Sequence, residues 1–115
     1  MEIIKQRIIQ ELVPGRQITL AHIIANPDPS LYPSLSMENE IHSAIGILTI
    51  TPPETAIIIA DIAIKSAGVK VISVDRVSGS LIVTGTVSAV ESAVRAILEY
   101  VGITLGFEVC SLTKT

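Results

Sequence analysis

The side chains that could carry out catalysis or bind a metal in this sequence are two histidines, His22 and His42, and one cysteine, Cys110. No Cys, Asp or Glu lies beside either histidine at a recognisable ligand spacing, so neither predicts a metal site. His22 falls in a predicted strand, which favours a hydrogen-bonded structural histidine. The basic residue nearest to Cys110 is Lys114, and the surrounding stretch is apolar. This favours a packed thiol over a nucleophile.

Glycines and hydroxyl residues are present, but they do not form a known site. Gly79 and Gly85 do not make the phosphate-binding loop that leads into a helix. No nucleophile, base and orienting acid can be proposed together. The sequence therefore predicts no enzyme, no cofactor and no bound metal.

The chain has few charges for its size. It has 115 residues, of which 49% are apolar and 17% are charged, whereas about a quarter of an average chain is charged. Its mean hydropathy is +0.62. Three explanations compete: a membrane segment, a poorly soluble monomer, or a subunit that buries much of its surface against partners.

Self-assembly is the explanation that agrees best with the other features of the sequence. The longest apolar run, residues 56–60, ends at Asp61, far short of the roughly 20 residues that span a bilayer. Residues 1–7 lack the apolar core of a secretion signal, so we expect a cytoplasmic protein. A net charge of −3, two Tyr and one Phe argue against a nucleic-acid partner.

Two segments of the second half repeat one pattern. Residues 44–50 form a predicted strand, and Thr51-Pro52-Pro53-Glu54 is a predicted capping box. A helix should follow to about residue 67, with Gly68 as a left-handed stop, and residues 69–74 should form a strand.

The second copy starts with a predicted strand at residues 80–86. Ser88-Ala89-Val90-Glu91 is again a predicted capping box, followed by a helix to about Val101 and a closing strand within residues 103–112. Two β-α-β units in succession predict an α+β, ferredoxin-like sheet. Its helices should cover one face and leave the other face free.

The helix predicted after residue 54 should itself take part in assembly. Isoleucines point around most of its circumference, whereas a surface helix normally has one apolar stripe. Asp61 and Lys65 are spaced for a helical ion pair.

The first forty residues follow another pattern. Val13-Pro14-Gly15 predicts a turn, residues 17–25 a strand, and residues 26–34 a rigid, proline-containing connection. Residues 1–13 are ambiguous, because their apolar spacing suits a helix slightly better than a short strand.

Three motifs, in this order, carry a family resemblance: residues 10–22 (QELVPGRQITLAH), 44–52 (AIGILTITP) and 75–80 (DRVSGS). They resemble circularly permuted bacterial microcompartment (BMC) shell proteins, of the ethanolamine-utilisation S type and propanediol-utilisation U type. The resemblance extends over nearly the whole chain. It implies a single permuted BMC domain, with a barrel strand and turn at residues 1–15 and an α/β core at residues 16–115.

In this family, residues 6–13 would be a strand that joins those of five symmetry mates in a β-barrel on the sixfold axis. That assignment replaces the weak helical preference of the pattern. The residues assigned to the barrel are Ile8, Ile9, Gln10, Glu11, Leu12 and Val13.

The resemblance also implies roles for residues of the core. Ser78, Gly79 and Ser80 match the stretch that lines a pore on the axis; the pattern alone indicates only a β-turn. Lys65 matches the lysine at the hexamer edge, where the alternative is a solvated lysine at a helix end.

Ser43 stands where some relatives with bent hexamers have glycine, so we expect a flat ring. Near residues 26–28 the chain lacks the edge arginine of ordinary subunits.

The predicted function is a structural shell protein. It forms a homohexamer that tiles with other shell proteins, encloses enzymes of ethanolamine, choline or propanediol metabolism, and controls passage of small metabolites. The sequence does not choose among these pathways. The alternative is a ferredoxin-like regulatory domain that senses a small molecule, which should have a polar ligand cleft between subunits.

Overall fold

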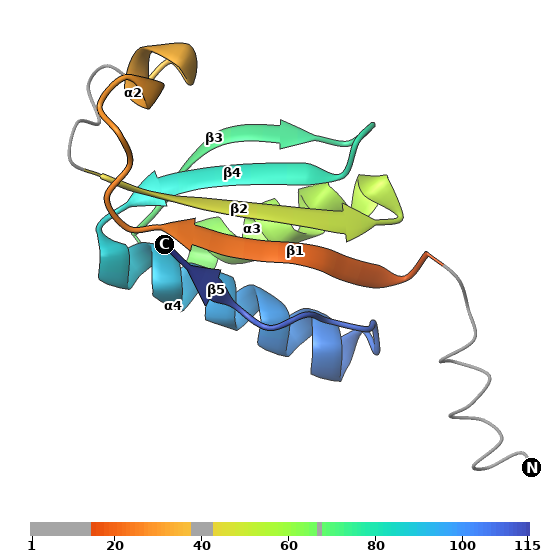
Figure 1. The fold of residues 1–115 in the computed structure, drawn as a ribbon. Helices are drawn as coiled ribbons and strands as arrows, with labels where there is room; N and C mark the ends of the chain where they lie inside the picture. The colour runs from red at the N-terminus through yellow and green to blue at the C-terminus, as the bar shows by residue number, and fades with distance from the viewer. Residues whose placement is uncertain (1–14, 38–42, 67) are drawn as a thin grey trace, which may run out of the picture.

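A mixed five-stranded sheet has two long helices packed on one of its faces (Figure 1). The computed structural model describes residues 15–37, 43–66 and 68–115. The predicted barrel residues 8–13 lie outside this part of the chain. In order, the elements are β1 (Gln17–Ile24), α2 (Leu31–Ser34), β2 (Ala44–Thr51), the 3₁₀ turn η2 (Pro53–Thr55), α3 (Ala56–Ser66), β3 (Lys70–Asp75), β4 (Ser80–Gly85), α4 (Val87–Glu99), the π-helical turn η3 (Tyr100–Thr104) and β5 (Thr113–Lys114).

The strand order is β3-β4-β2-β1-β5. All neighbours are antiparallel except β1 and β5, which run parallel. The central strand β2 therefore pairs on one side with β4 and on the other with β1, which comes from the start of the described chain. The predicted α+β class is confirmed.

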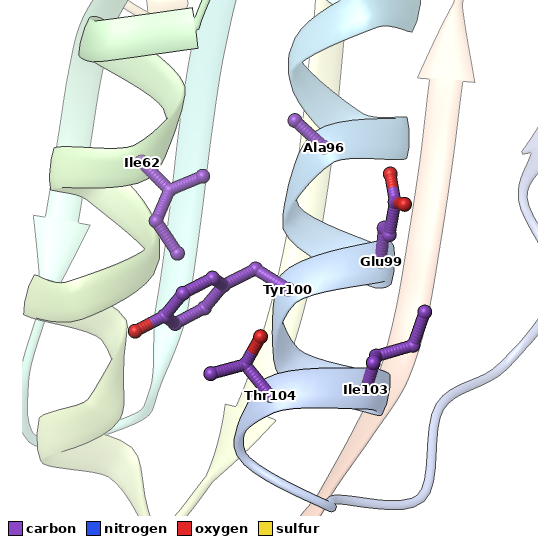
Figure 2. Close-up of a pocket in the computed structure, with 6 residues that line it drawn as sticks. All are labelled: Ile62, Ala96, Glu99, Tyr100, Ile103 and Thr104. Carbon is purple, nitrogen blue, oxygen red and sulfur yellow. The ribbon is translucent and has the colours of Figure 1, made fainter.

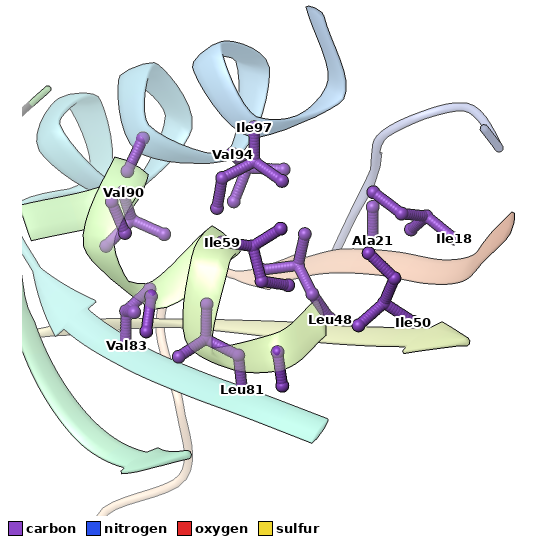
Figure 3. Close-up of a cluster of buried hydrophobic side chains, with 14 of the residues drawn as sticks. Ile18, Ala21, Leu48, Ile50, Ile59, Leu81, Val83, Val90, Val94 and Ile97 are labelled. Carbon is purple, nitrogen blue, oxygen red and sulfur yellow. The ribbon is translucent and has the colours of Figure 1, made fainter. Parts of the chain in front are cut away.

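The main core lies between the sheet and the helices α3 and α4 (Figure 3). Alternate residues of the strands face this layer, as expected for a half-buried sheet. Gly46 of β2 lets α4 approach closely, since a Cβ there would lie 2.8 Å from Cγ1 of Val90. The core side chains include Ile18, Leu48, Ile50, Ile59, Leu81, Val83, Val94 and Ile97.

The other face of the sheet is partly covered, so the prediction of a free face is wrong at one end. Tyr32 and Met37 are buried there with Ile45, and Ile47 and Ile82 pack against them. The cover comes from the proline-containing segment, which forms the short helix α2. Two large apolar side chains in this segment gain from burial against the sheet.

Both predicted capping boxes are wrong. Thr51 is the last residue of β2, and its hydroxyl donates to the carbonyl of Gln17 at 3.5 Å. The residue that caps α4 is Thr86, whose side chain accepts from the N–H of Ala89 at 3.1 Å. Ser88 therefore lies inside the first turn of that helix. At α4, the cap falls on the residue that directly follows the end of β4, whereas the turn η2 has no side-chain cap.

The predicted left-handed stop at Gly68 is also wrong. Among the described residues, the glycines with positive φ are Gly15, Gly79 and Gly106. The last described residue of helix α3 is Ser66, whose hydroxyl donates to the carbonyl of Ala63 at 3.4 Å. This bond satisfies one of the carbonyls that a helix end leaves without an intrahelical partner.

The closing strand is shorter than predicted and lies beyond the predicted range of residues 103–112. The helical path continues to Thr104, and only Thr113–Lys114 forms a strand. Between them, Glu108 exchanges backbone hydrogen bonds with Arg16 and Ile18 at the start of β1. None of the helices in the described ranges is long and apolar enough to cross a bilayer.

Candidate functional site

The turn between β3 and β4 is organised by the carboxylate of Asp75. Its Oδ1 accepts from the backbone N–H of Val77 at 2.8 Å and of Ser78 at 3.3 Å, and its carbonyl accepts from the N–H of Gly79 at 2.8 Å. These amides lower the pKa of the Asp75 carboxyl, because they bond to its charged form. The carboxylate of this motif thus holds the turn in shape.

Gly79 attaches the turn to the end of β2. Its φ is +81°, and an added Cβ would overlap the carbonyl oxygen of Ile50 and come within 3.1 Å of Cα of Pro53. The N–H of Ile50 donates to the carbonyl of Gly79 at 2.8 Å. Only glycine combines this conformation with so close an approach of two backbones.

The three predicted pore residues differ in what they present to solvent. Ser78 is exposed, Ser80 is half-buried and Gly79 is buried. The hydroxyls of Ser78 and Ser80 lie 3.0 Å apart, so the turn offers a pair of hydroxyls. The most exposed apolar side chain of the turn is Val77, at 81%. Sequence reasoning missed it, although an apolar residue between Arg76 and Ser78 in a tight turn has no interior to enter.

The turn and the start of β1 lie at the same end of the molecule (Figure 1). Gln17 of β1 pairs with Thr51 of β2, and the neighbouring Ile50 bonds to Gly79 of the turn. The chain that precedes β1 therefore enters the described fold beside this turn.

Lys65 lies at the other end of α3, in its last turn. Its Nζ is 3.0 Å from Oδ2 of Asp61, which confirms the predicted ion pair, and the two side chains are 74% and 59% exposed. An exposed pair of this kind adds little to stability. The amine is therefore accessible to a neighbouring molecule.

The apolar character of α3 on more than one side is confirmed. Ile59 and Ala63 are fully buried against the sheet, whereas Ile57, Ile58 and Ile64 are about half exposed. Exposed isoleucines in these numbers on one short helix indicate a contact surface.

Ser43 lies just before β2 and takes part in the cover of the second sheet face. Its carbonyl accepts from the hydroxyl of the buried Tyr32 at 3.1 Å. Ser43 does not have a positive φ; Ser36 is the non-glycine residue with one in the described chain. The backbone at Ser43 is therefore in an ordinary conformation and is anchored by a hydrogen bond.

The predicted structural role of His22 is confirmed. Its Nδ1 lies 2.6 Å from Oγ1 of Thr113 and its Nε2 2.9 Å from Oγ1 of Thr115, so the ring fastens the end of the chain to β1. Cys110 is a half-buried free thiol that packs against the main core. His42 lies outside the described residues. No group of three or more potential metal ligands occurs in the part of the chain that the structure describes.

Known proteins that resemble this chain are shell proteins of bacterial microcompartments. The family model for the BMC domain matches residues 44–112. The chain is 50% identical to "Bacterial microcompartment shell protein PduU" of Salmonella typhimurium over 109 residues, which are 95% of this chain and 93% of that protein. It is 50% identical to shell protein CutR of Streptococcus intermedius over 109 residues (95% and 92%). Its identity to shell protein EutS of Salmonella typhimurium is 48% over 111 residues (96% and 98%).

Solved structures of a relative agree with the fold. "CutR flat hexamer, form 1" superposes with a TM-score of 0.84 at 47% identity, covering 90% of this chain and 94% of that one. "CutR Screw, form 1 with 41.9 angstrom pitch" superposes with a TM-score of 0.83 at 46% identity, covering 89% and 100%.

These relatives are structural shell proteins and not enzymes, and they give no support to the alternative of a regulatory sensing domain. The family match spans more than half of the chain, and the identities extend over nearly all of it. The chain therefore belongs to the BMC-domain family of bacterial microcompartment shell proteins.

Proposed function

We propose that six copies of this chain form a closed ring, and that these rings tile with other shell proteins around a microcompartment in the bacterial cytoplasm. The observation that carries this proposal is the match, over nearly the whole chain, to a relative solved as a flat hexamer. The half-exposed isoleucines of α3 and the exposed Val77 support it independently. They would be covered in an assembly and left in water in a monomer.

The chain is a circularly permuted form of the domain in this proposal. Support comes from the sheet order. After α4, a second β-α-β unit should place a strand beside β2, but β1 occupies that position and β5 has only two residues. A strand that is last in the unpermuted order would thus come first in this chain.

The end that carries the turn faces the sixfold axis in this proposal. The chain enters β1 beside that turn, so residues 8–13 would be close enough to the axis to form the barrel implied by the family resemblance. The hydroxyls of Ser78 and Ser80 would face the pore and favour small polar metabolites through hydrogen bonds. Passage would then depend on whether the barrel closes the axis.

Lys65 belongs to the outer edge of the ring in this proposal, because it lies at the end of α3 away from the turn. We expect Lys65→Glu to form hexamers but to fail to join them into sheets, since each edge contact would lose a cation and gain an anion. Native mass spectrometry measures the hexamer, and negative-stain electron microscopy measures the sheets. Lys65→Arg is the matched control and should form both. Sheets of Lys65→Glu indistinguishable from those of the unmodified chain would contradict the edge role.

Enzymes enclosed by the shell are the remaining partners in this proposal. The relatives PduU, CutR and EutS do not single out one pathway for this chain. Co-purification of intact compartments with the tagged chain, followed by mass spectrometry of their contents, would identify the enclosed enzymes. Tagged chain found outside compartments would contradict the shell location.

A further inference from the structure

Two apolar hollows border the end of the molecule that carries the β3–β4 turn. The first, hollow A, is lined by Ile57 at the start of α3, by Ser73 and Val74 of β3, and by Asp75, Arg76 and Val77. Of its apolar side chains, Ile57 is 53%, Val74 42% and Val77 81% exposed. On the β3 side of the molecule, Val77 therefore projects beside the apolar surface formed by Ile57 and Val74.

The second, hollow B, lies over the C-terminal end of α4 and reaches Ile62 of α3 (Figure 2). It is lined by Ile62, Ala96, Glu99, Tyr100, Ile103 and Thr104. Tyr100 points toward α3, whereas Glu99 and Ile103 lie on the side of α4 away from α3. Ile103 is 76% exposed, so this hollow also has a projecting apolar side chain beside an apolar floor.

Each hollow offers one charged side chain that a neighbouring protomer could pair with. Among the residues that the structure describes, Glu99 is the one charged residue that lines hollow B. Hollow A contains Arg76 and Asp75, but the carboxylate of Asp75 is occupied by the amides of the turn. Within the described ranges, neither Arg76 nor Glu99 forms an ion pair, whereas Lys65, Arg95 and Lys114 each pair with a carboxylate. A cation and an anion thus remain available, one at each hollow.

The position of the hollows suits a ring. Both lie near the end that carries the turn: hollow A includes the turn itself, and hollow B adjoins the segment that bonds to the start of β1. They are different surfaces of one chain, so their contact would be head-to-tail, the type that closes into rings. A contact of each hollow with its own copy would instead give a twofold dimer.

We propose that hollow A of one protomer docks on hollow B of the next, with Arg76 paired to Glu99 across the interface. This inference rests on the proposed hexamer and adds which surfaces form it. The projecting Val77 and Ile103 supply the apolar contact, and the ion pair sets the register, as charges at interfaces generally do. The partner is a second copy of this chain.

Charge reversal tests the pairing. Arg76→Glu and Glu99→Arg each place like charges across every interface, and each should raise the concentration at which the hexamer dissociates by at least about tenfold. The double variant, Arg76→Glu with Glu99→Arg, restores the pair in the opposite order and should restore the hexamer. Native mass spectrometry over a dilution series gives the measurement. Circular dichroism of each variant separates loss of assembly from loss of fold.

Mixing the two single variants tests the head-to-tail arrangement. In a ring that alternates the variants, every interface joins residues 76 and 99 of opposite charge. The mixture should therefore form hexamers with three copies of each at concentrations where neither variant assembles alone. The matched control is Glu108→Arg, the same reversal at an exposed carboxylate outside both hollows, which should leave the hexamer intact.

The outcomes separate this inference from the proposed function. If the unmodified chain is a hexamer and both single variants assemble equally well, the interface assignment is wrong and the hollows are open to another partner. If single variants dissociate but neither the double variant nor the mixture recovers, the pairing of Arg76 with Glu99 is wrong. If the unmodified chain is not a hexamer, the ring is wrong and this interface with it.

Discussion

At the scale of single residues, the shape of the β3–β4 turn depends on Gly79. Its φ of +81° is unfavourable for other residues, and a Cβ would overlap the carbonyl oxygen of Ile50. We expect the unfavourable backbone conformation alone to make Gly79→Ala lower the free energy of unfolding by about 1–2 kcal/mol. The overlap of the added Cβ with the carbonyl oxygen of Ile50 should increase this loss. Urea denaturation followed by circular dichroism gives the value.

Gly68→Ala is the control for this substitution. Gly68 has no positive φ, and an added Cβ there would meet nothing within 4 Å. The variant should be as stable as the unmodified chain or slightly more stable, because alanine restricts the unfolded chain. Equal losses in the two variants would mean that the close approach at Gly79 is not what makes glycine necessary.

The Asp75 carboxylate gives the turn a dependence on pH. Its pKa is lowered from the usual 3.8 by the amides of Val77 and Ser78. A lowered pKa in the folded state means that the stabilisation is complete above the unfolded pKa and is lost as the pH falls through the folded pKa. The turn should therefore stay intact at neutral pH and loosen only in strong acid.

Titration of the Val77 and Ser78 amide resonances by NMR checks this prediction. Their transition should have a midpoint below 3.8. In Asp75→Asn the transition should disappear, because the amide side chain does not titrate. A midpoint at or above the usual value would contradict the bonding of this carboxylate to the turn.

At the scale of elements, the start of α4 shows how a strand end determines a helix cap. Thr86 follows β4 directly, and its hydroxyl accepts from the N–H of Ala89. We expect Thr86→Ala to lower the free energy of unfolding by about 0.5–2 kcal/mol, the usual cost of losing such a cap. Ser88→Ala should change it much less, since Ser88 lies within the helix. Thermal or urea unfolding measures the loss of stability in both variants. A larger loss in Ser88→Ala than in Thr86→Ala would mean that Ser88 is the cap, as expected from sequence.

Elements with a clear apolar period were predictable from sequence, and those held by distant partners were not. The strands near residues 44–50, 69–74 and 80–86 and both long helices follow from local pattern. The closing strand was predicted wrongly, because Glu108 bonds to the backbone of β1, about ninety residues away in sequence. The motif located the turn correctly. The burial of Gly79 was not visible, since it depends on the neighbouring β2.

At the scale of the whole molecule, the same features serve fold and assembly. Helix α3 buries one side against the sheet and leaves isoleucines exposed on the other, in line with the low charge content of the chain. The turn and the start of β1 share one end, and Lys65 lies at the other end of α3. In the proposed ring, this arrangement would place the turn toward the axis and Lys65 toward neighbouring rings.

One residue, Ser43, is expected to control whether the assembled ring is flat. Ser43 leads into β2 with ordinary backbone angles, and its carbonyl is bonded to the Tyr32 hydroxyl. Glycine at this position would widen the accessible conformations. Structures of the relative CutR are described both as a flat hexamer and as a screw, so subunits of that protein pack in more than one arrangement.

We therefore expect the unmodified chain to form flat sixfold rings, and Ser43→Gly to shift part of the population to bent or screw-like assemblies. Cryo-electron microscopy of both proteins under identical conditions measures the fractions. Ser43→Ala is the matched control, because it removes the hydroxyl while keeping the backbone restricted, and it should remain flat. Tyr32→Phe removes the bond to the Ser43 carbonyl and should shift the population in the same direction as glycine. Flat rings in all four proteins would show that planarity is decided elsewhere in the subunit.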